Sequence, residues 1–442
     1  MNHNQSIRCS VCNSGINVRI QAGYEESTKI RFCCPECGIP INVEAVFKVL
    51  DKGMINVSYK YLRNAYLVEE DLSKMKYAIQ GSNHYITTKN ILNPHNAESF
   101  GQDISSPFMQ MRSYLGDNII KFQAHCKVGI DATNKFHVYE RINKLYSLRS
   151  KYFIDNINKA FDEENIDKKV GNTEQSMLEG IYFFNIYYFN LFLVPGEFAE
   201  KNKIINTAIA DIKKKNSNEF NKMVKAFCSN GTIEIYEKKL LRTIDSYIKK
   251  FRYFMPAISL KYLLSNIDKN NLFRKFTIRT ITFYDIKNIY LEVYENILDV
   301  YSVAIALNNI FYRNSYSKMG NMPKELSSNY FKKHKIKSLD DFMHLTNGCK
   351  IHYLKEDEIF NELMPKLNNK LRNMLGHESW IYDDSIQKIL SNIVTKDKAK
   401  TYEKDLLEYA YECYGMFLNV VTMYKLVIDI KNSYIKLSEE QD

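Results

Sequence analysis

Two pairs of cysteines near the start of the chain have the spacing of metal ligands. Two residues separate Cys9 from Cys12 and Cys34 from Cys37, and 21 residues lie between the pairs. A two-residue spacer lets a tight turn aim two thiolates at one tetrahedral ion at about 2.3 Å, so the four cysteines predict a Zn²⁺ site. Four protein ligands leave no open position for water, which indicates a structural metal and not a catalytic one.

The cysteine pattern resembles a zinc ribbon over about residues 7–45. One ambiguity concerns the third ligand, because Cys33 lies beside Cys34 and could replace it or remain a spare thiol. The two-residue spacer to Cys37 favours Cys34. The other cysteines are scattered in helical context and are expected to be small buried side chains: Cys126, Cys228, Cys349 and Cys413.

A second group that could do chemistry is Arg372, Asn373 and His377, within the segment KLRNMLGHE. Histidine titrates near neutral pH, so His377 can take the proton of a 2′-hydroxyl or protonate a leaving 5′-oxygen. The permanently charged guanidinium of Arg372 can stabilise charge on the non-bridging phosphate oxygens. These residue types therefore suit RNA cleavage without a catalytic metal.

The Arg-Asn-x3-His segment, in a helical C-terminal region, resembles the motif of the HEPN superfamily. The resemblance implies that Arg372, Asn373 and His377 occupy the catalytic motif positions. It also implies a metal-independent endoribonuclease that acts as a homodimer, with two motif copies meeting at the interface. On an ideal helix Arg372 lies about 140° from His377, so two helices facing across a two-fold axis would focus both groups better than one. The expected products carry 2′,3′-cyclic phosphate and 5′-hydroxyl ends.

The elements that must position these groups are mostly helical. Gly (16) and Pro (8) are scarce in 442 residues, which favours long helices. Short alternating runs at 17–20 and 39–43 predict strands around the cysteines. We therefore expect a mainly α protein, with a small β zinc ribbon over 1–50, a mixed and then helical middle region over 51–264, and a HEPN-like helical bundle over 265–442.

Helix-period patterns predict several segments of the C-terminal region. One long amphipathic helix is expected over 284–311 and another segment over about 354–376, interrupted by Pro365. The residues Asp384-Ser385-Ile386-Gln387 resemble a helix-start signature. A final helix is expected from about 400 to 437. No phosphate-binding loop, dinucleotide motif, nucleophile elbow or HExxH zinc-protease motif occurs, so those enzyme classes lack support.

The net charge of +10 permits a polyanionic partner. Basic residues gather in the middle region around 213–252, where they could track a phosphate backbone or could form a solvated helix face with compensating carboxylates. Lys332, Lys333 and Lys335 form a basic run that could bind RNA beside the motif, or a solvated loop.

The start of the chain, MNHNQSIRCS, has no apolar signal core, and an odd number of cysteines (9) indicates a reducing compartment. We therefore expect a cytoplasmic protein. Residues 180–196 are uncharged but contain two asparagines and a proline, which predicts a buried helix and no membrane span.

The resemblance implies a toxin or antiviral defence effector whose trigger or antitoxin is unknown. The ribbon and the middle region would sense that trigger. The alternative is a non-catalytic zinc-ribbon protein that binds nucleic acid or regulates, and whose helical bundle only dimerises.

Overall fold

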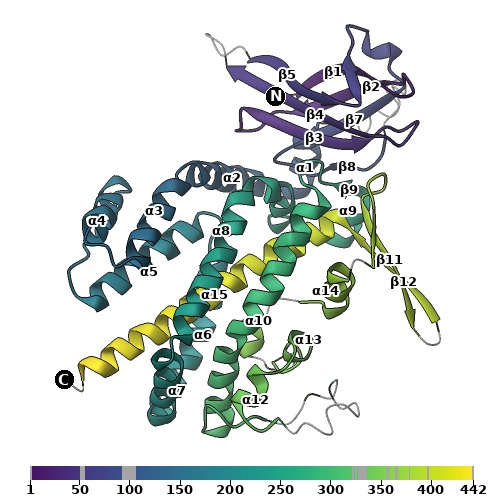
Figure 1. Cartoon of the computed structure of the whole chain (residues 1–442). Coiled ribbons are helices and arrows are strands. Elements are labelled where there is room, and N and C mark those ends of the chain that lie inside the picture. The colour runs from purple at the N-terminus through teal and green to yellow at the C-terminus, as the bar shows by residue number, and fades with distance from the viewer. Residues whose placement is uncertain are drawn as a thin grey trace. The chain divides into compact units, whose positions relative to one another are not determined.

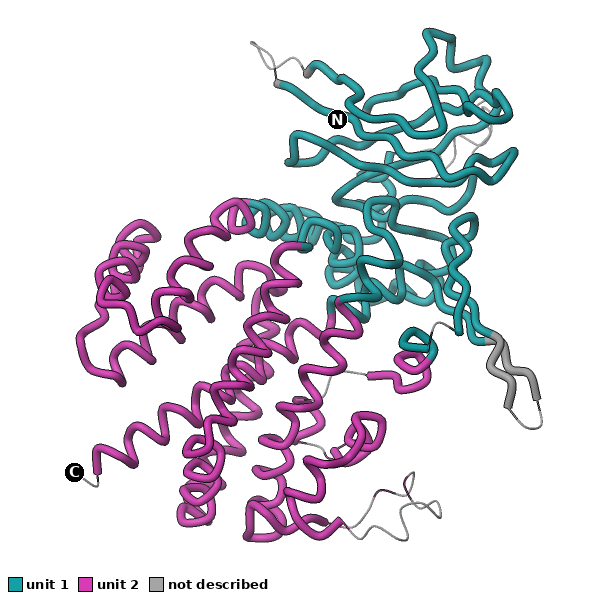
Figure 2. Tube along the Cα trace, viewed as in Figure 1, with its two compact units in different colours: residues 1–130, 250–288, 374–414 teal, residues 131–249, 289–373, 415–442 magenta. Residues whose placement is uncertain are grey.

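A computed structural model of the chain describes residues 2–49, 55–91, 106–320, 323, 326, 336–354, 357, 359–363, 367–377, 379–395 and 398–440. The chain divides into two compact units, each assembled from three separate stretches of sequence (Figure 2). Unit 1 comprises residues 1–130, 250–288 and 374–414, and unit 2 comprises residues 131–249, 289–373 and 415–442.

The N-terminal part of unit 1 consists of two sheets (Figure 1). The first has the strand order β6-β1-β2-β7, with β2 and β7 parallel, and contains β1 (Asn2–Cys9), β2 (Gly15–Gln21), β6 (Ala65–Leu67) and β7 (Tyr77–Ser82). The second is antiparallel, with the order β3-β4-β5, and contains β3 (Ser27–Cys33), β4 (Pro40–Val49) and β5 (Ile55–Arg63).

The strands of the two sheets pack their apolar side chains into one core. In β3 every second residue is buried, and Ile30 and Phe32 join Ile16, Val18 and Val43 in a continuous apolar core. The strands predicted at 17–20 and 39–43 are thus confirmed in β2 and β4. Strands continue past residue 50 as far as Thr88, so the β region of the structure is larger than a ribbon of fifty residues.

The rest of unit 1 joins short elements to parts of long helices. Its strands are β8 (Thr87–Thr88), paired with β9 (Phe276–Thr277), and the sheet β10 (Ile381–Asp383), β11 (Lys388–Thr395) and β12 (Lys398–Asp405). Its helical elements are η2 (Leu72–Lys74), α1 (Pro107–Leu115), η4 (Ser259–Lys261) and α9 (Lys269–Lys275), with the first part of α2 (Asn118–Asn134). Ser106 caps α1 by accepting the Met109 N–H.

Unit 2 is helical. It contains α3 (Phe136–Ser147), α4 (Phe153–Glu163), α5 (Glu174–Asn190), α6 (Glu197–Lys215), α7 (Ser217–Ser229), α12 (Leu339–Met343), α13 (Asn347–Lys350) and η6 (Phe360–Leu363). Like α2, four further helices have residues in both units: α8 (Thr232–Ile258), α10 (Phe283–Arg313), α14 (Asn369–Gly376) and α15 (Leu406–Glu439). In the core of unit 2 the rings of Tyr139 and Tyr188 stack 4.7 Å apart.

The protein is therefore a mixed structure, with N-terminal sheets around the cysteines and a largely helical remainder that ends in a long helix. The helix α10 confirms the amphipathic segment predicted over 284–311. The segment predicted over 354–376 contains the short elements η6 and α14, and Pro365 lies outside the described residues.

The predicted helix start at Asp384-Ser385-Ile386-Gln387 is wrong. These residues form the turn between β10 and β11, and Gln387 has a left-handed φ of 51°. The carboxylate of Asp383 accepts hydrogen bonds from the backbone N–H and the hydroxyl of Ser385, so the polar cluster closes a turn and does not cap a helix. The final helix accordingly begins at Leu406 and not near residue 400, because 398–405 is the strand β12.

Two apolar helices were examined as candidates for a membrane-spanning segment, α5 and α15. Residues 180–190 belong to α5, in which Ile181, Phe184 and Phe189 are buried, as the sequence predicted. Within the part of the chain that the structure describes, α15 is long and apolar enough to cross a membrane. Since 83% of its most apolar window is buried inside the protein, α15 matches a core helix and is weak evidence for a span.

One half-buried carboxyl in unit 2 predicts a pH dependence of stability. Burial raises the pKa of Asp245, on α8, to about 6, against the opposing effect of the Tyr139 hydroxyl. The folded state therefore binds a proton that the unfolded state has released between about pH 4 and 6, and stability falls as the pH rises through this window. We expect Asp245→Asn to raise the free energy of unfolding by about 2 kcal/mol at pH 8 and to change it little at pH 4. Urea denaturation of both proteins at the two pH values measures this, and an equal shift at both would contradict it.

Candidate zinc centre and basic-histidine motif

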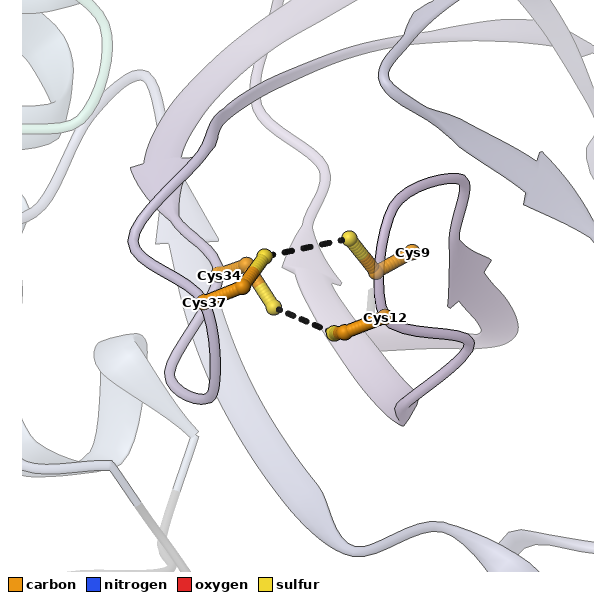
Figure 3. A group of neighbouring side chains, drawn as sticks. All are labelled: Cys9, Cys12, Cys34 and Cys37. Carbon is orange, nitrogen blue, oxygen red and sulfur yellow. Dashed lines mark hydrogen bonds between the residues drawn. The ribbon is translucent and has the colours of Figure 1, made fainter.

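The four predicted cysteine ligands meet at the ends of two strand pairs in unit 1. Cys9 ends β1 and Cys12 lies in the turn to β2, whereas Cys34 and Cys37 lie in the turn between β3 and β4. Figure 3 shows the two pairs facing each other, with Cys9 Sγ 3.7 Å from Cys37 Sγ and Cys12 Sγ 3.6 Å from Cys34 Sγ. All four sulfurs lie within 4.8 Å of one another.

These separations fit a tetrahedral zinc ion. With metal–sulfur bonds of about 2.3 Å, the sulfurs of a regular tetrahedron lie about 3.8 Å apart, close to the two pair distances. The chemistry of the donor set agrees, since four thiolates select Zn²⁺ over harder cations. Cys9, Cys12, Cys34 and Cys37 would therefore hold a structural zinc ion with all four positions filled by protein.

Local backbone geometry brings each pair into position. In the first turn the Cys9 carbonyl accepts the N–H of Asn13, whose φ of 61° is left-handed. In the second turn the Cys34 carbonyl accepts the N–H of Gly38, whose φ of 75° favours glycine. The two turns thus repeat one arrangement, in which a residue with positive φ follows the second cysteine.

Cys34, and not Cys33, belongs to the cluster. Cys33 is the last residue of β3, and successive side chains of a strand point to opposite faces, so it faces away from the other sulfurs. Burial, and to a lesser extent Asp384 and Asp383, raise the pKa of the Cys33 thiol to about 11. The remaining cysteines are buried or half-buried and form no disulfide: Cys126, Cys228, Cys349 and Cys413.

The short helix α14 carries Arg372 and Asn373 of the motif, and its first residues are anchored on α10 within unit 2. The side chain of Asn368 accepts the N–H of Leu371 and caps the helix. The hydroxyl of Tyr294 donates to Asn369 Oδ1 over 3.0 Å, and the Tyr290 hydroxyl exchanges hydrogen bonds with the backbone of Asn368. Four hydrogen bonds therefore fix the start of α14.

The guanidinium of Arg372 is also fixed on α10. Its Nε and Nη2 atoms donate to Glu295 Oε1 over 3.0 Å and 2.6 Å, and the group lies 5.6 Å from the centre of the Tyr294 ring. Nη1 donates to Asn373 Oδ1 over 3.3 Å. Arg372 thus keeps its charge oriented while its side chain remains 31% exposed.

The structure places His377 directly after Gly376, the last residue of α14, and exposes it along with Asn373. Because His377 is exposed, its ring is accessible from solvent. Arg372 and Asn373 contact each other in unit 2, whereas His377 belongs to unit 1. Sequence reasoning missed Glu295, because one acidic residue on a long amphipathic helix has no distinguishing spacing.

The contact between Arg372 and Glu295 predicts a small effect on stability. Both groups are partly exposed, with side chains 31% and 44% accessible, and ion pairs of this kind contribute about 1 kcal/mol or less. We expect Glu295→Ala to lower the free energy of unfolding by no more than about 1 kcal/mol. Urea denaturation measures the change, and a loss several times larger would contradict the view that this pair orients the arginine more than it stabilises the fold.

Two further groups of basic residues were candidates for binding a polyanion. Lys332, Lys333 and Lys335 lie outside the described residues. In the basic middle region several lysines and one arginine form ion pairs with carboxylates. These pairs favour a solvated helix face with compensating charges over a surface that binds a phosphate backbone. The pairs are Lys222 with Glu219, Lys239 with Asp299, Arg242 with Glu292, and Lys249 with Glu140.

No protein-family model matches the chain, and comparisons with curated proteins and with solved structures find no match either.

Proposed function

We propose that the chain is a metal-independent endoribonuclease of the HEPN type that acts as a homodimer on RNA. Its products would carry 2′,3′-cyclic phosphate and 5′-hydroxyl ends. The helical C-terminal region would be the HEPN-like bundle, and the zinc ribbon would stabilise the N-terminal sheets. The proposed biological role is a toxin or antiviral defence effector.

The observation that carries this proposal is the setting of Arg372. Its guanidinium is oriented by Glu295 and partly exposed, in the helix that ends one residue before the exposed His377. A fixed cation and an accessible imidazole are the two groups that cleavage by an internal 2′-hydroxyl needs. His377 would be the acid–base catalyst, and Arg372 would stabilise the charged phosphorane, with Asn373 as a polar neighbour.

The homodimer is part of the proposal because Arg372 and His377 lie about 140° apart on an ideal helix, so one helix would not direct both groups at one phosphate. A two-fold axis near the end of α14 would let His377 of one protomer approach Arg372 of the other. Each dimer would then contain two composite sites.

The test is the choice of substrate. Purified full-length protein, in EDTA at a concentration that leaves the cysteine site loaded, is incubated with an RNA and with DNA of the same sequence. The proposal predicts cleavage of the RNA alone, because DNA lacks the attacking 2′-hydroxyl. Cleavage of both polymers would contradict it.

The second candidate is a non-catalytic zinc-ribbon protein that binds nucleic acid or regulates, favoured by the four-sulfur cluster and the net charge of +10. It predicts salt-dependent binding that survives His377→Ala, with no cleavage.

A further inference from the structure

Unit 1 contains a cavity of about 320 Å³ that is lined by residues other than the four cysteines and the motif. Its walls come from the end of β2 and the residues after it, from the loop that follows β7, and from the helices α1 and α2. The lining residues are Gln21, Ala22, Gly23, Tyr24, His84, Tyr85, Phe108 and Gln123. The volume lies at the lower end of the range for small-molecule sites, about 300 to 1,000 Å³.

His84, one of the lining residues, is buried and has a ring nitrogen without a hydrogen-bond partner among the described residues. Its side chain is 3% exposed, and Nε2 has no hydrogen-bond partner among the described residues. Burial lowers the pKa of the ring to about 4, so His84 is neutral at physiological pH. An unpaired buried nitrogen costs free energy, and a ligand that bonds to it would recover that cost.

The position of His84 depends on Gly23. A Cβ atom built on Gly23 would lie 1.9 Å from His84 Cε1 and 2.0 Å from Nδ1, closer than any real contact. The absence of a side chain at Gly23 therefore leaves the room that the His84 imidazole occupies beside the backbone.

The other lining groups are aromatic faces and neutral hydrogen-bonding groups. The rings of Tyr24 and His84 are 5.2 Å apart, and those of Tyr85 and Phe108 are 6.0 Å apart. Gln123 Nε2 donates to the Tyr85 hydroxyl over 2.8 Å, which leaves the hydroxyl proton and the second amide proton of Gln123 for a ligand. Burial raises the pKa of Tyr85, so this hydroxyl stays protonated as a donor.

No lining residue carries a charge at neutral pH. The nearest carboxylate in sequence, Glu25, accepts a hydrogen bond from Asn83 over 2.8 Å and pairs with Arg252 over 3.1 Å, so its charge is compensated outside the lining. A phosphate, carboxylate or ammonium group would find no counter-charge in this cavity. The recognised part of a ligand must therefore be planar, uncharged and able to both donate and accept hydrogen bonds.

We propose that this cavity binds the base of a nucleoside, with the ring between the aromatic side chains and its polar edge on His84 Nε2, the Tyr85 hydroxyl and the Gln123 amide. A nucleobase combines a flat π-face with a mixed donor and acceptor edge, which is the complement of this lining. The proposal concerns unit 1 alone and does not depend on the ribonuclease proposal.

The test is titration calorimetry of the full-length protein with adenosine, guanosine, cytidine and uridine, with ribose as the comparison ligand. We expect at least one nucleoside to bind with a Kd of about 1 mM or tighter, and ribose to bind more weakly than that. Failure of all four nucleosides to reach this affinity, or equal binding of ribose, would overturn the assignment.

Variants then locate the bound nucleoside. Gln123→Leu lies on a helix and replaces a half-buried amide with a good helix former, so it should fold. We expect it to raise the Kd at least tenfold, while the matched variant Gln175→Leu on α5 leaves the Kd unchanged. His84→Phe should weaken binding in the same way. A Kd unaffected by Gln123→Leu would overturn the proposed site, whether or not His84→Phe folds.

Discussion

Replacing Cys34 with serine is expected to release the metal and unfold the N-terminal sheets, whereas replacing its neighbour Cys33 with serine is expected to do neither. The Cys34 sulfur lies 3.6 Å from that of Cys12 in the four-sulfur cluster, and Cys33 lies outside the cluster. A serine hydroxyl stays protonated and cannot replace a thiolate ligand of zinc. Structural zinc sites supply about 10 to 16 kcal/mol of binding free energy, which exceeds the stability of most domains.

The measurement is the zinc content of each purified variant, together with its circular dichroism. The structure predicts one zinc ion per chain in the wild type and in Cys33→Ser, and a loss of metal and of strand signal in Cys34→Ser. Retention of one equivalent of zinc by Cys34→Ser together with its loss from Cys33→Ser would contradict the ligand assignment.

Replacing His377 with alanine is expected to slow RNA cleavage by about 10² to 10⁴, the contribution typical of an acid–base group. Stability should change little, because His377 is exposed and follows the last turn of α14. His344 provides the control, since it is an exposed histidine just after α12. His344→Ala should cleave at the wild-type rate, and an equal loss in both variants would contradict a specific role for His377.

Mixing two inactive variants tests whether the site is composite. If Arg372 and His377 act from opposite protomers, dimers reassembled from Arg372→Ala and His377→Ala chains should recover about a quarter of the wild-type activity. Half of the dimers are then mixed, and each mixed dimer has one intact site. No recovery in demonstrably mixed dimers would place both groups in one chain.

Much of the fold near the cysteines could be predicted because a local rule governs it. The two-residue spacers between cysteines predicted the turns, and the alternation of apolar residues such as Val18 and Ile20 with polar ones predicted the strands. The long helix α10 could likewise be predicted, because its apolar residues recur with the period of a helix. The rule failed at 384–387, where a polar cluster is compatible with either a helix cap or a hairpin turn. There the choice depends on the pairing of β11 with β12, which no local pattern shows.

The surroundings of the candidate sites could not be predicted, because they join residues far apart in sequence. Glu295 reaches Arg372 across 77 positions, and nothing in either segment marks the other. The cavity depends on the absence of a side chain at Gly23 and on a histidine that lies in turn-rich sequence without a metal-ligand partner. Such sites become visible only when tertiary packing brings their parts together.

The central claim is that this protein cleaves RNA by attack of the internal 2′-hydroxyl, without a catalytic metal. The most direct measurement is the end-group chemistry of fragments made by the wild-type protein and by His377→Ala from cellular RNA in EDTA. The account predicts 2′,3′-cyclic phosphate and 5′-hydroxyl ends from the wild type, and intact RNA with His377→Ala. Fragments with 5′-phosphate ends, or the same fragments from both proteins, would contradict it.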